Sequence, residues 1–266
     1  MKKLLFCLLL SVAATSAVTT STQAGTFYVS TDNNEVGEID ELTGSYTKLV
    51  STQAFTDIAL SPSDELFGIT FSKLYSVDLD SKESTYIGKL GKQLNALGFS
   101  DNNELYGSGG DNFYSIDTSS GKASSISKIP DFSSSGDIVF DAARDLFWAT
   151  SKGDSLWSIT RDGVGTKIGD IGYGEVYGLA FGDDQTLFGY TANQEQLALN
   201  LETGAGTFVR KISDFNSQQQ IWGAASEPDA TTIAMQATSQ SVAEPTTLLG
   251  LLSVGTLFVG SRLRRK

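Results

Sequence analysis

The amino-acid sequence predicts an all-β protein assembled from a repeated unit of four strands. Short alternating apolar runs are separated by turns rich in Gly, Asp, Asn and Ser, which is the pattern of strands joined by tight turns. Between the two chain ends, no segment keeps the i, i+3, i+4 apolar spacing of an amphipathic helix. The same motifs recur about every forty residues, five times in all. This combination is typical of a five-bladed β-propeller, in which each four-stranded sheet buries its two apolar faces against its neighbours.

Each unit begins with a short apolar strand that we assign to the inner edge of a blade. Its copies lie at residues 57–60, 96–99, 137–140 and 178–181, with a degraded fifth copy at 223–226. A polar turn leads to a second strand at residues 66–68, 105–107, 146–148 and 187–189, and 27–29 supplies the fifth copy. The third strand recurs at 73–78, 112–117 and 155–160, with weaker copies at 35–40 and 196–200. The outer strand is expected at 46–50, 85–90, 124–129, 166–171 and 207–212.

The phase of the repeat predicts that the ring is closed by both ends of the domain. Four complete blades run from residue 55 to 214, which leaves three strands at 26–50 and one inner strand at 220–226. Together these make a fifth blade and remove the open sheet edges that invite aggregation. In a β-sandwich or an open solenoid, the incomplete units at the two ends of the domain would not have to add up to one complete blade. The repeat is similar to those of propellers in exported bacterial proteins, many with six or seven blades, and that resemblance implies no particular activity.

The N-terminus has the pattern of a secretory signal peptide, residues 1–24. Lys2 and Lys3 precede a mostly apolar run over residues 4–13, and the small residue Ala24 offers a cleavage point for signal peptidase. An uncleaved membrane anchor is the alternative. After the propeller domain, residues 25–226, the periodicity stops. Residues 227–243 are rich in Ala, Thr, Ser and Gln and are expected to form a flexible linker.

The C-terminus, residues 244–266, combines a short motif, an apolar segment and a basic end. Glu244 and Pro245 precede a mostly apolar stretch at 246–261, expected to be a membrane-inserted helix, and the basic end includes Arg262, Arg264 and Arg265. This order resembles the PEP-CTERM sorting signal, although Ala243 stands where that family usually has its first proline. The resemblance implies transient anchoring and processing by an exosortase-type protease, in the setting of a biofilm or extracellular matrix. A simple membrane anchor is the alternative.

Composition excludes several classes of chemistry. The chain has no His, and its one Cys, Cys7, lies in the predicted signal peptide, so His-dependent triads, His-ligated metals and thiol catalysis are not expected. Residues 25–243 carry 13 Lys and Arg against 30 Asp and Glu, so nucleic acid is not an expected partner. No cofactor is expected. Calcium could bind the acidic segments 32–35 and 101–104, but Asn and Asp are also the residues that tight turns select.

Two pairs of side chains are candidates for a functional site. Asp57 and Asp137 begin equivalent inner strands in non-adjacent blades, and both are expected to point toward one mouth of the axis. A glycoside hydrolase would need such carboxyls about 5–5.5 or 6.5–9.5 Å apart. Tyr177 and Trp222 precede glycines on adjacent inner strands, where uncovered aromatic faces would form a platform for a sugar. Trp148, which replaces a repeat glycine, is a weaker candidate.

We therefore expect an exported, surface-associated, non-enzymatic binding or scaffold protein that contacts extracellular polysaccharide. One alternative is a secreted glycoside hydrolase-like enzyme that uses Asp57 and Asp137. Another is a purely structural matrix component with no discrete ligand. Tyr75, Tyr114 and Trp157 recur at one repeat position and are expected to be core residues rather than ligand contacts.

Overall fold

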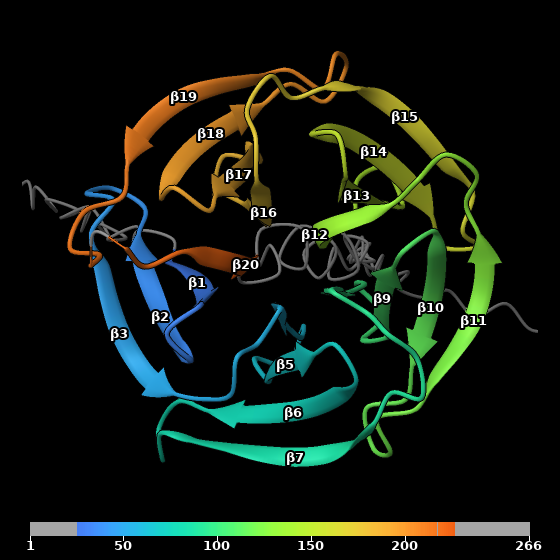
Figure 1. The fold of residues 1–266 in the computed structure, drawn as a ribbon, viewed down its shortest axis with the longest axis horizontal. Coiled ribbons are helices and arrows are strands. Elements are labelled where there is room, and N and C mark those ends of the chain that lie inside the picture. The colour runs from blue at the N-terminus through green and yellow to red at the C-terminus, as the bar shows by residue number, and fades with distance from the viewer. Residues whose placement is uncertain (1–25, 217, 227–266) are drawn as a thin grey trace, which may run out of the picture. The chain divides into compact units, whose positions relative to one another are not determined.

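Five four-stranded antiparallel sheets form a ring around a common axis in the computed structural model, which describes residues 26–216 and 218–226 (Figure 1). From the axis outward, the first blade consists of β20 (Ile221–Ser226), β1 (Thr26–Thr31), β2 (Glu35–Asp40) and β3 (Tyr46–Ser51). The second consists of β4 (Asp57–Leu60), β5 (Leu66–Thr70), β6 (Lys73–Asp78) and β7 (Glu83–Lys89). The third consists of β8 (Ala96–Phe99), β9 (Leu105–Gly109), β10 (Asn112–Ile116) and β11 (Ala123–Lys128).

The last two blades follow the same order. The fourth consists of β12 (Ser134–Asp141), β13 (Leu146–Ser151), β14 (Ser155–Thr160) and β15 (Gly165–Asp170). The fifth consists of β16 (Val176–Phe181), β17 (Leu187–Thr191), β18 (Glu195–Leu199) and β19 (Gly206–Lys211). The predicted all-β, five-bladed architecture is confirmed. The strand bounds agree with the expected ones to within three residues, and the largest shifts are at the start of β12 and the end of β13.

The ring closes as the repeat phase predicts. β1 pairs antiparallel with β20, in a register that places Phe27 opposite Ser226 and Val29 opposite Ala224. No helix in the described ranges, 26–216 and 218–226, is long and apolar enough to cross a membrane. The predicted signal peptide, linker and C-terminal helix at 1–24, 227–243 and 244–266 lie outside those residues.

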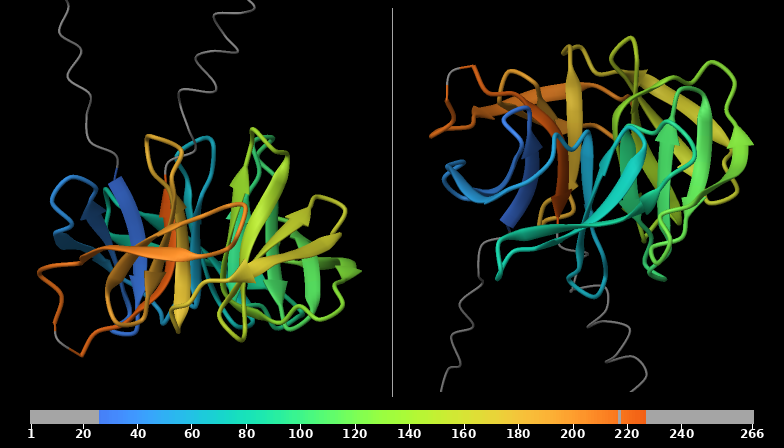
Figure 2. Two further views of the ribbon diagram at one scale, coloured as in Figure 1. Left: turned by 90° about the horizontal axis from the view of Figure 1, so that it is seen from above. Right: turned by 60° about the horizontal axis from the view of Figure 1, so that its bottom comes forward.

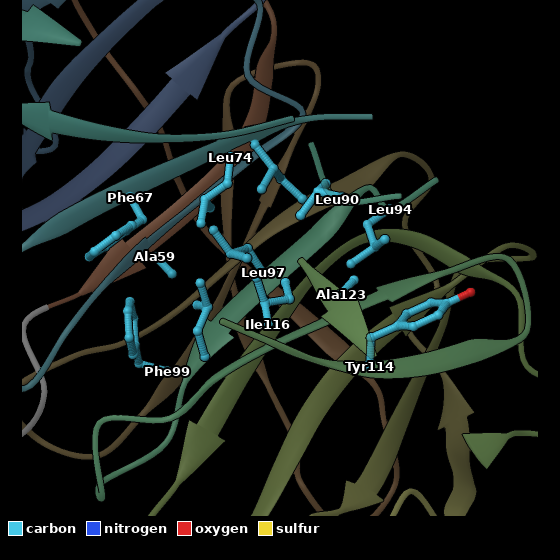
Figure 3. Packing of buried hydrophobic residues seen from close by; sticks show 12 residues of the cluster. Ala59, Phe67, Leu74, Leu90, Leu94, Leu97, Phe99, Tyr114, Ile116 and Ala123 are labelled. Atoms are coloured by element: carbon cyan, nitrogen blue, oxygen red, sulfur yellow. The ribbon is translucent and has the colours of Figure 1, made fainter. Parts of the chain in front are cut away.

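Apolar side chains fill the spaces between neighbouring blades. Figure 3 shows one such cluster, in which Phe67 and Leu74 of the second blade meet Leu97 and Phe99 of the third. Burial of a side chain of this size stabilises the fold by roughly 1.5–3 kcal/mol. Tyr75, Tyr114 and Trp157 are all buried, as expected for core residues.

Turn chemistry repeats with the blades. At the ends of β2 and β6, Asp40 and Asp78 accept backbone N–H bonds from residues three positions later, and Asp117 and Asn200 do the same after β10 and β18. These bonds stabilise the ionised carboxylates, so the backbone bonds from Thr43 and Ser81 lower the pKa of Asp40 and Asp78. An Asp or Asn at the end of the third strand therefore sets the following turn.

The five inner strands begin on one face of the ring and end on the other (Figure 2). Because β1 runs antiparallel to β20, the start of β1 and the end of β20 lie together, on the face where inner strands end. The described chain thus starts at Thr26 and leaves at Ser226 on a single face.

Candidate functional site

Five backbone amides at equivalent repeat positions surround the axis. In the repeat, residues 57, 96, 137, 178 and 223 occupy the same position on the five inner strands. The amides belong to the residues that follow them: Ile58, Leu97, Ile138, Leu179 and Ala224. An inner strand pairs with its own sheet on one side only, so N–H groups on its other edge need separate acceptors when they are buried. At this level of the ring, two carboxyl groups supply most of those acceptors.

Asp57 and Asp137 accept hydrogen bonds from four of these five amides, and both residues are 0% exposed. Asp57 Oδ1 accepts from Ile58 N at 2.8 Å, and its Oδ2 accepts from Leu97 N at 2.6 Å. Asp137 Oδ2 accepts from Leu179 N at 2.6 Å and from Ala224 N at 3.1 Å. We call these two side chains the axial carboxyl pair.

The two carboxyls of the axial pair interact electrostatically inside the protein, so ionisation of one disfavours ionisation of the other. Burial raises the pKa of both groups well above their usual range, and the charge of Asp137 raises that of Asp57 further. Asp137 Oδ1 is buried and has no hydrogen-bond partner among the described residues.

Glycines let the inner strands approach the axial pair. A Cβ atom on Gly223 would lie 2.2 Å from Asp57 Oδ1, and one on Gly178 would lie 2.9 Å from the Cβ of Ala224. Both distances are too short for real contacts. The sequence suggested that these glycines uncover the faces of Tyr177 and Trp222, but their contacts are with the strands and carboxyl at the axis.

The expectation that Asp57 and Asp137 point into an open mouth is not met. The structure brings the two carboxyls together, but it buries both and binds them to backbone amides. A glycosidase needs its carboxyls on either side of a sugar, with room for water or the substrate between them. The geometry on which the hydrolase alternative depends is therefore absent from this pair.

An open pocket of about 430 Å³ lies at the mouth of the ring where the inner strands begin. Its aromatic lining consists of Phe71, Tyr177 and Trp222, and its polar lining includes Thr56, Gln93, Asn95, Ser135 and Lys152. Thr56 and Asn95 immediately precede β4 and β8, whereas Tyr177 and Trp222 are the second residues of β16 and β20. We call this side of the molecule the pocket face. Pockets of this size and mixed lining are typical of small-molecule sites.

Tyr177 and Trp222, predicted as a platform, both line the pocket and are partly exposed. Burial raises the pKa of the Tyr177 hydroxyl, and the charges of Glu175 and Asp154 raise it further, so this hydroxyl stays protonated and can donate. Phe71, which was not among the predicted site residues, is 56% exposed in the turn between β5 and β6. Its sequence signal is a large apolar residue in a two-residue turn, where polar residues are usual.

Trp148 does not contact the pocket. Its side chain is buried in the cluster between the fourth and fifth blades, and its Nε1 donates to Asp141 Oδ2 at 3.0 Å. The weaker ligand-contact prediction for this residue is wrong, because a ring in this repeat position points between blades.

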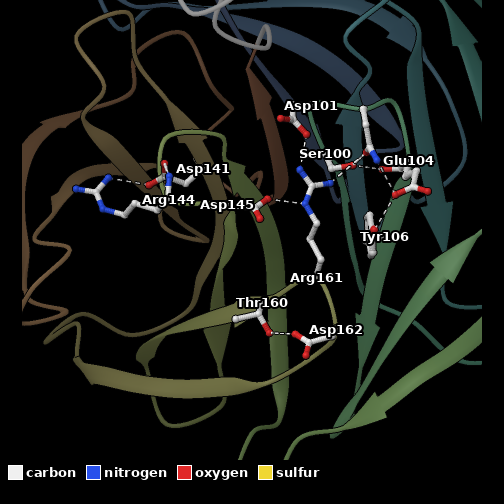
Figure 4. Close-up of polar contacts among 11 residues, drawn as sticks. Ser100, Asp101, Glu104, Tyr106, Asp141, Arg144, Asp145, Thr160, Arg161 and Asp162 are labelled. Atoms are coloured by element: carbon white, nitrogen blue, oxygen red, sulfur yellow. Dashed lines mark hydrogen bonds and ion pairs between the residues drawn. The ribbon is translucent and has the colours of Figure 1, made fainter.

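The two acidic segments considered for calcium are turns with internal partners. Asn34 and Asn103 adopt left-handed backbone, with φ of 61° and 64°. At the 101–104 turn, the guanidinium of Arg161 bonds to Asp101 and, at 3.1 Å, to Asn102 Oδ1 (Figure 4). It also bonds to Asp145 at 2.6 Å. Among the described residues, no three His, Cys, Asp or Glu side chains are arranged to hold a metal.

These features define a class of molecule: a five-bladed β-propeller with an aromatic pocket over its axis. No family model and no curated protein sequence matches the chain. It is similar in structure to a Bacteroides thetaiotaomicron protein of unknown function, with a TM-score of 0.52 and 16% identity over 74% of this chain. The match spans 61% of that protein's length.

A second similar structure comes from work on the de novo evolutionary emergence of a symmetrical protein. It has a TM-score of 0.50 and 13% identity, and the match covers 77% of this chain and 99% of the other. At these identities, both likenesses concern the fold alone.

Proposed function

We propose that this chain is an exported, surface-associated, non-enzymatic binding protein whose axial pocket holds a sugar unit of an extracellular polysaccharide. The observation that carries the proposal is the pocket of about 430 Å³, lined by Tyr177, Trp222 and Phe71. The C–H face of a sugar ring stacks on aromatic side chains, and its hydroxyls exchange hydrogen bonds with amides and hydroxyls. Gln93, Asn95 and Ser135 supply such groups in the pocket lining.

The path of the chain supports presentation of this pocket away from the cell. The pocket face is where inner strands begin, whereas the described chain leaves the ring at Ser226 on the opposite face. Residues 227–243 and the sorting-like segment after Glu244 and Pro245 follow that exit. If these residues tether the domain to a membrane, the pocket is on the side remote from the tether.

Binding is tested with a glycan array and the full-length protein. Tyr177→Ala and Trp222→Ala are each expected to lower binding about fivefold to 150-fold, if a sugar ring stacked on one aromatic side chain gains about 1–3 kcal/mol, as a stacked nucleobase does. Phe208→Ala is the matched control, since Phe208 is 48% exposed on the outer strand β19. No binding to any glycan, or binding unaffected by the two pocket substitutions, would leave a purely structural role as the better proposal.

Export and C-terminal processing are tested separately, by mass spectrometry of the protein recovered from cells and medium. We expect an N-terminus at Gly25 after cleavage by signal peptidase at Ala24. We also expect a C-terminus near Glu244 and Pro245 in a host that carries an exosortase-type protease. Deletion of the basic end at 262–266 is expected to abolish C-terminal processing. Recovery of the intact chain from the cytoplasm would refute export.

A further inference from the structure

We infer that the axial pocket takes an acidic sugar, such as a uronate, with its ring on the aromatic lining and its carboxylate at Lys152. This inference rests on the proposed function and names the class of sugar. Lys152 is the only charged side chain in the lining formed by the described residues. It lies in the turn between β13 and β14, where its backbone N donates to Ser133 O at 2.7 Å.

The charge of Lys152 is available to a ligand. It forms no ion pair with another described residue, whereas Lys48, Lys128, Lys167, Arg144 and Arg161 all pair with carboxylates. Its side chain is exposed at the rim, so a carboxylate can reach the ammonium without disturbing an existing contact.

The surroundings of the pocket favour one position for an anion. Asp154, in the same turn as Lys152, and Glu175 raise the pKa of the Tyr177 hydroxyl through their charge. Neither residue lines the pocket, and Asp154 Oδ1 is engaged by Glu175 N at 3.1 Å. Within the lining formed by the described residues, Lys152 is therefore the one charge that attracts a carboxylate.

An otherwise acidic surface makes this local arrangement selective. Residues 25–243 carry 13 Lys and Arg against 30 Asp and Glu, so the domain as a whole repels anions. An acidic sugar gains from binding only where a cation is within a few ångströms, since salt screens longer-range interactions beyond about 8–10 Å. In this domain, the pocket offers both such a cation and an aromatic platform for the ring.

The test measures Trp fluorescence or calorimetric titration of the full-length protein with galacturonate and with galactose, as monomers and as short oligomers. We expect the wild-type protein to bind the acidic form about tenfold more tightly at low salt, and this preference to shrink as salt rises. Lys152→Met is expected to abolish the preference but to keep binding of the neutral sugar. Lys152→Arg is expected to restore most of it.

Lys92→Met is the matched control, because Lys92 is an exposed lysine one residue before Gln93 that does not line the pocket. An equal loss of preference in Lys92→Met and Lys152→Met would show a general charge effect and overturn the inference. Equal affinity of the wild-type protein for both sugars would also overturn it, while the proposed function would stand. If neither sugar binds in any form, the inference fails, and the glycan array decides separately whether the carbohydrate proposal stands.

Discussion

Replacement of Asp137 tests whether the axial carboxyl pair holds the inner strands together. Its Oδ2 accepts from Leu179 N at 2.6 Å and from Ala224 N at 3.1 Å, on two different blades. Asp137→Ala removes this acceptor and leaves both amides buried without a partner. A buried, unpaired polar group costs about 1–3 kcal/mol, so the free energy of unfolding is expected to fall by about 2–6 kcal/mol.

Asp137→Asn separates this effect from a general loss of packing. The Asn carbonyl oxygen can take the place of Oδ2 and accept from both amides, and the neutral side chain does not repel the Asp57 carboxyl. We expect the free energy of unfolding at pH 7 to stay within about 1 kcal/mol of the wild-type value. Urea unfolding of both variants, followed by Trp fluorescence, gives the two differences at similar m-values.

The same pair predicts an unusual pH dependence. Because the pKa of each carboxyl is raised, the folded state keeps a proton that the unfolded state loses above about pH 4. Stability is therefore expected to fall as pH rises above this point, by up to about 1.4 kcal/mol per pH unit for each retained proton. Carboxylates with lowered pKa, such as Asp40 and Asp78, have the opposite effect, but only below that pH.

The pH dependence of Asp137→Asn is expected to be shallower between pH 5 and 8 than that of the wild-type protein, since Asp57 then loses a charged neighbour. Glu41→Gln is the control, because Glu41 is the other described carboxyl whose pKa is raised, mainly by burial. The reasoning is refuted if Asp137→Ala lowers stability by less than about 1 kcal/mol, or if Asp137→Ala and Asp137→Asn are equally destabilised.

Three further substitutions test other parts of the ring. Gly223→Ala places a Cβ 2.2 Å from the Asp57 carboxyl and is expected to cost about 1–3 kcal/mol in urea unfolding, whereas Gly174→Ala, whose nearest neighbour is 3.7 Å away, should be close to neutral. Arg161→Ala loses two partly exposed ion pairs, so its cost should be about 1 kcal/mol or less and should shrink further in 1 M salt; a large, salt-independent loss would contradict this. Trp148→Phe removes the donor to Asp141 Oδ2 and should lower the thermal midpoint without changing sugar binding, which a pocket role for this ring would reduce.

The fold was predictable because its determinants are local and repeated. Alternating apolar residues place each strand, and the incomplete units at 26–50 and 220–226 identify the closing blade without any long-range information. The same reasoning placed Tyr177 and Trp222 near one mouth, because both precede equivalent positions on inner strands.

The burial and hydrogen bonding of the site residues were less predictable, because both depend on how closely the backbones of different blades approach each other. Asp57 and Asp137 were expected near the axis, but their burial follows from how closely five strands converge, which no local pattern records. Phe71 and Lys152 lie in turns outside the repeated motifs, so comparison of the repeats with one another does not identify them as site residues. The glycines at the axis were hard to interpret for the same reason. Glycine is common in turns, but Gly223 lies in a strand, where the absence of a side chain leaves room for the Asp57 carboxyl.

The strand β20 joins the two faces of the ring over only six residues. Trp222 lines the pocket near its start, and Ser226 lies at its end, where the described chain leaves the domain. Tension between a bound polymer and a tether would run along this strand. Because its hydrogen bonds to β1 are perpendicular to that direction, they would be loaded together in shear rather than opened one at a time. The closing seam is therefore oriented to withstand pulling.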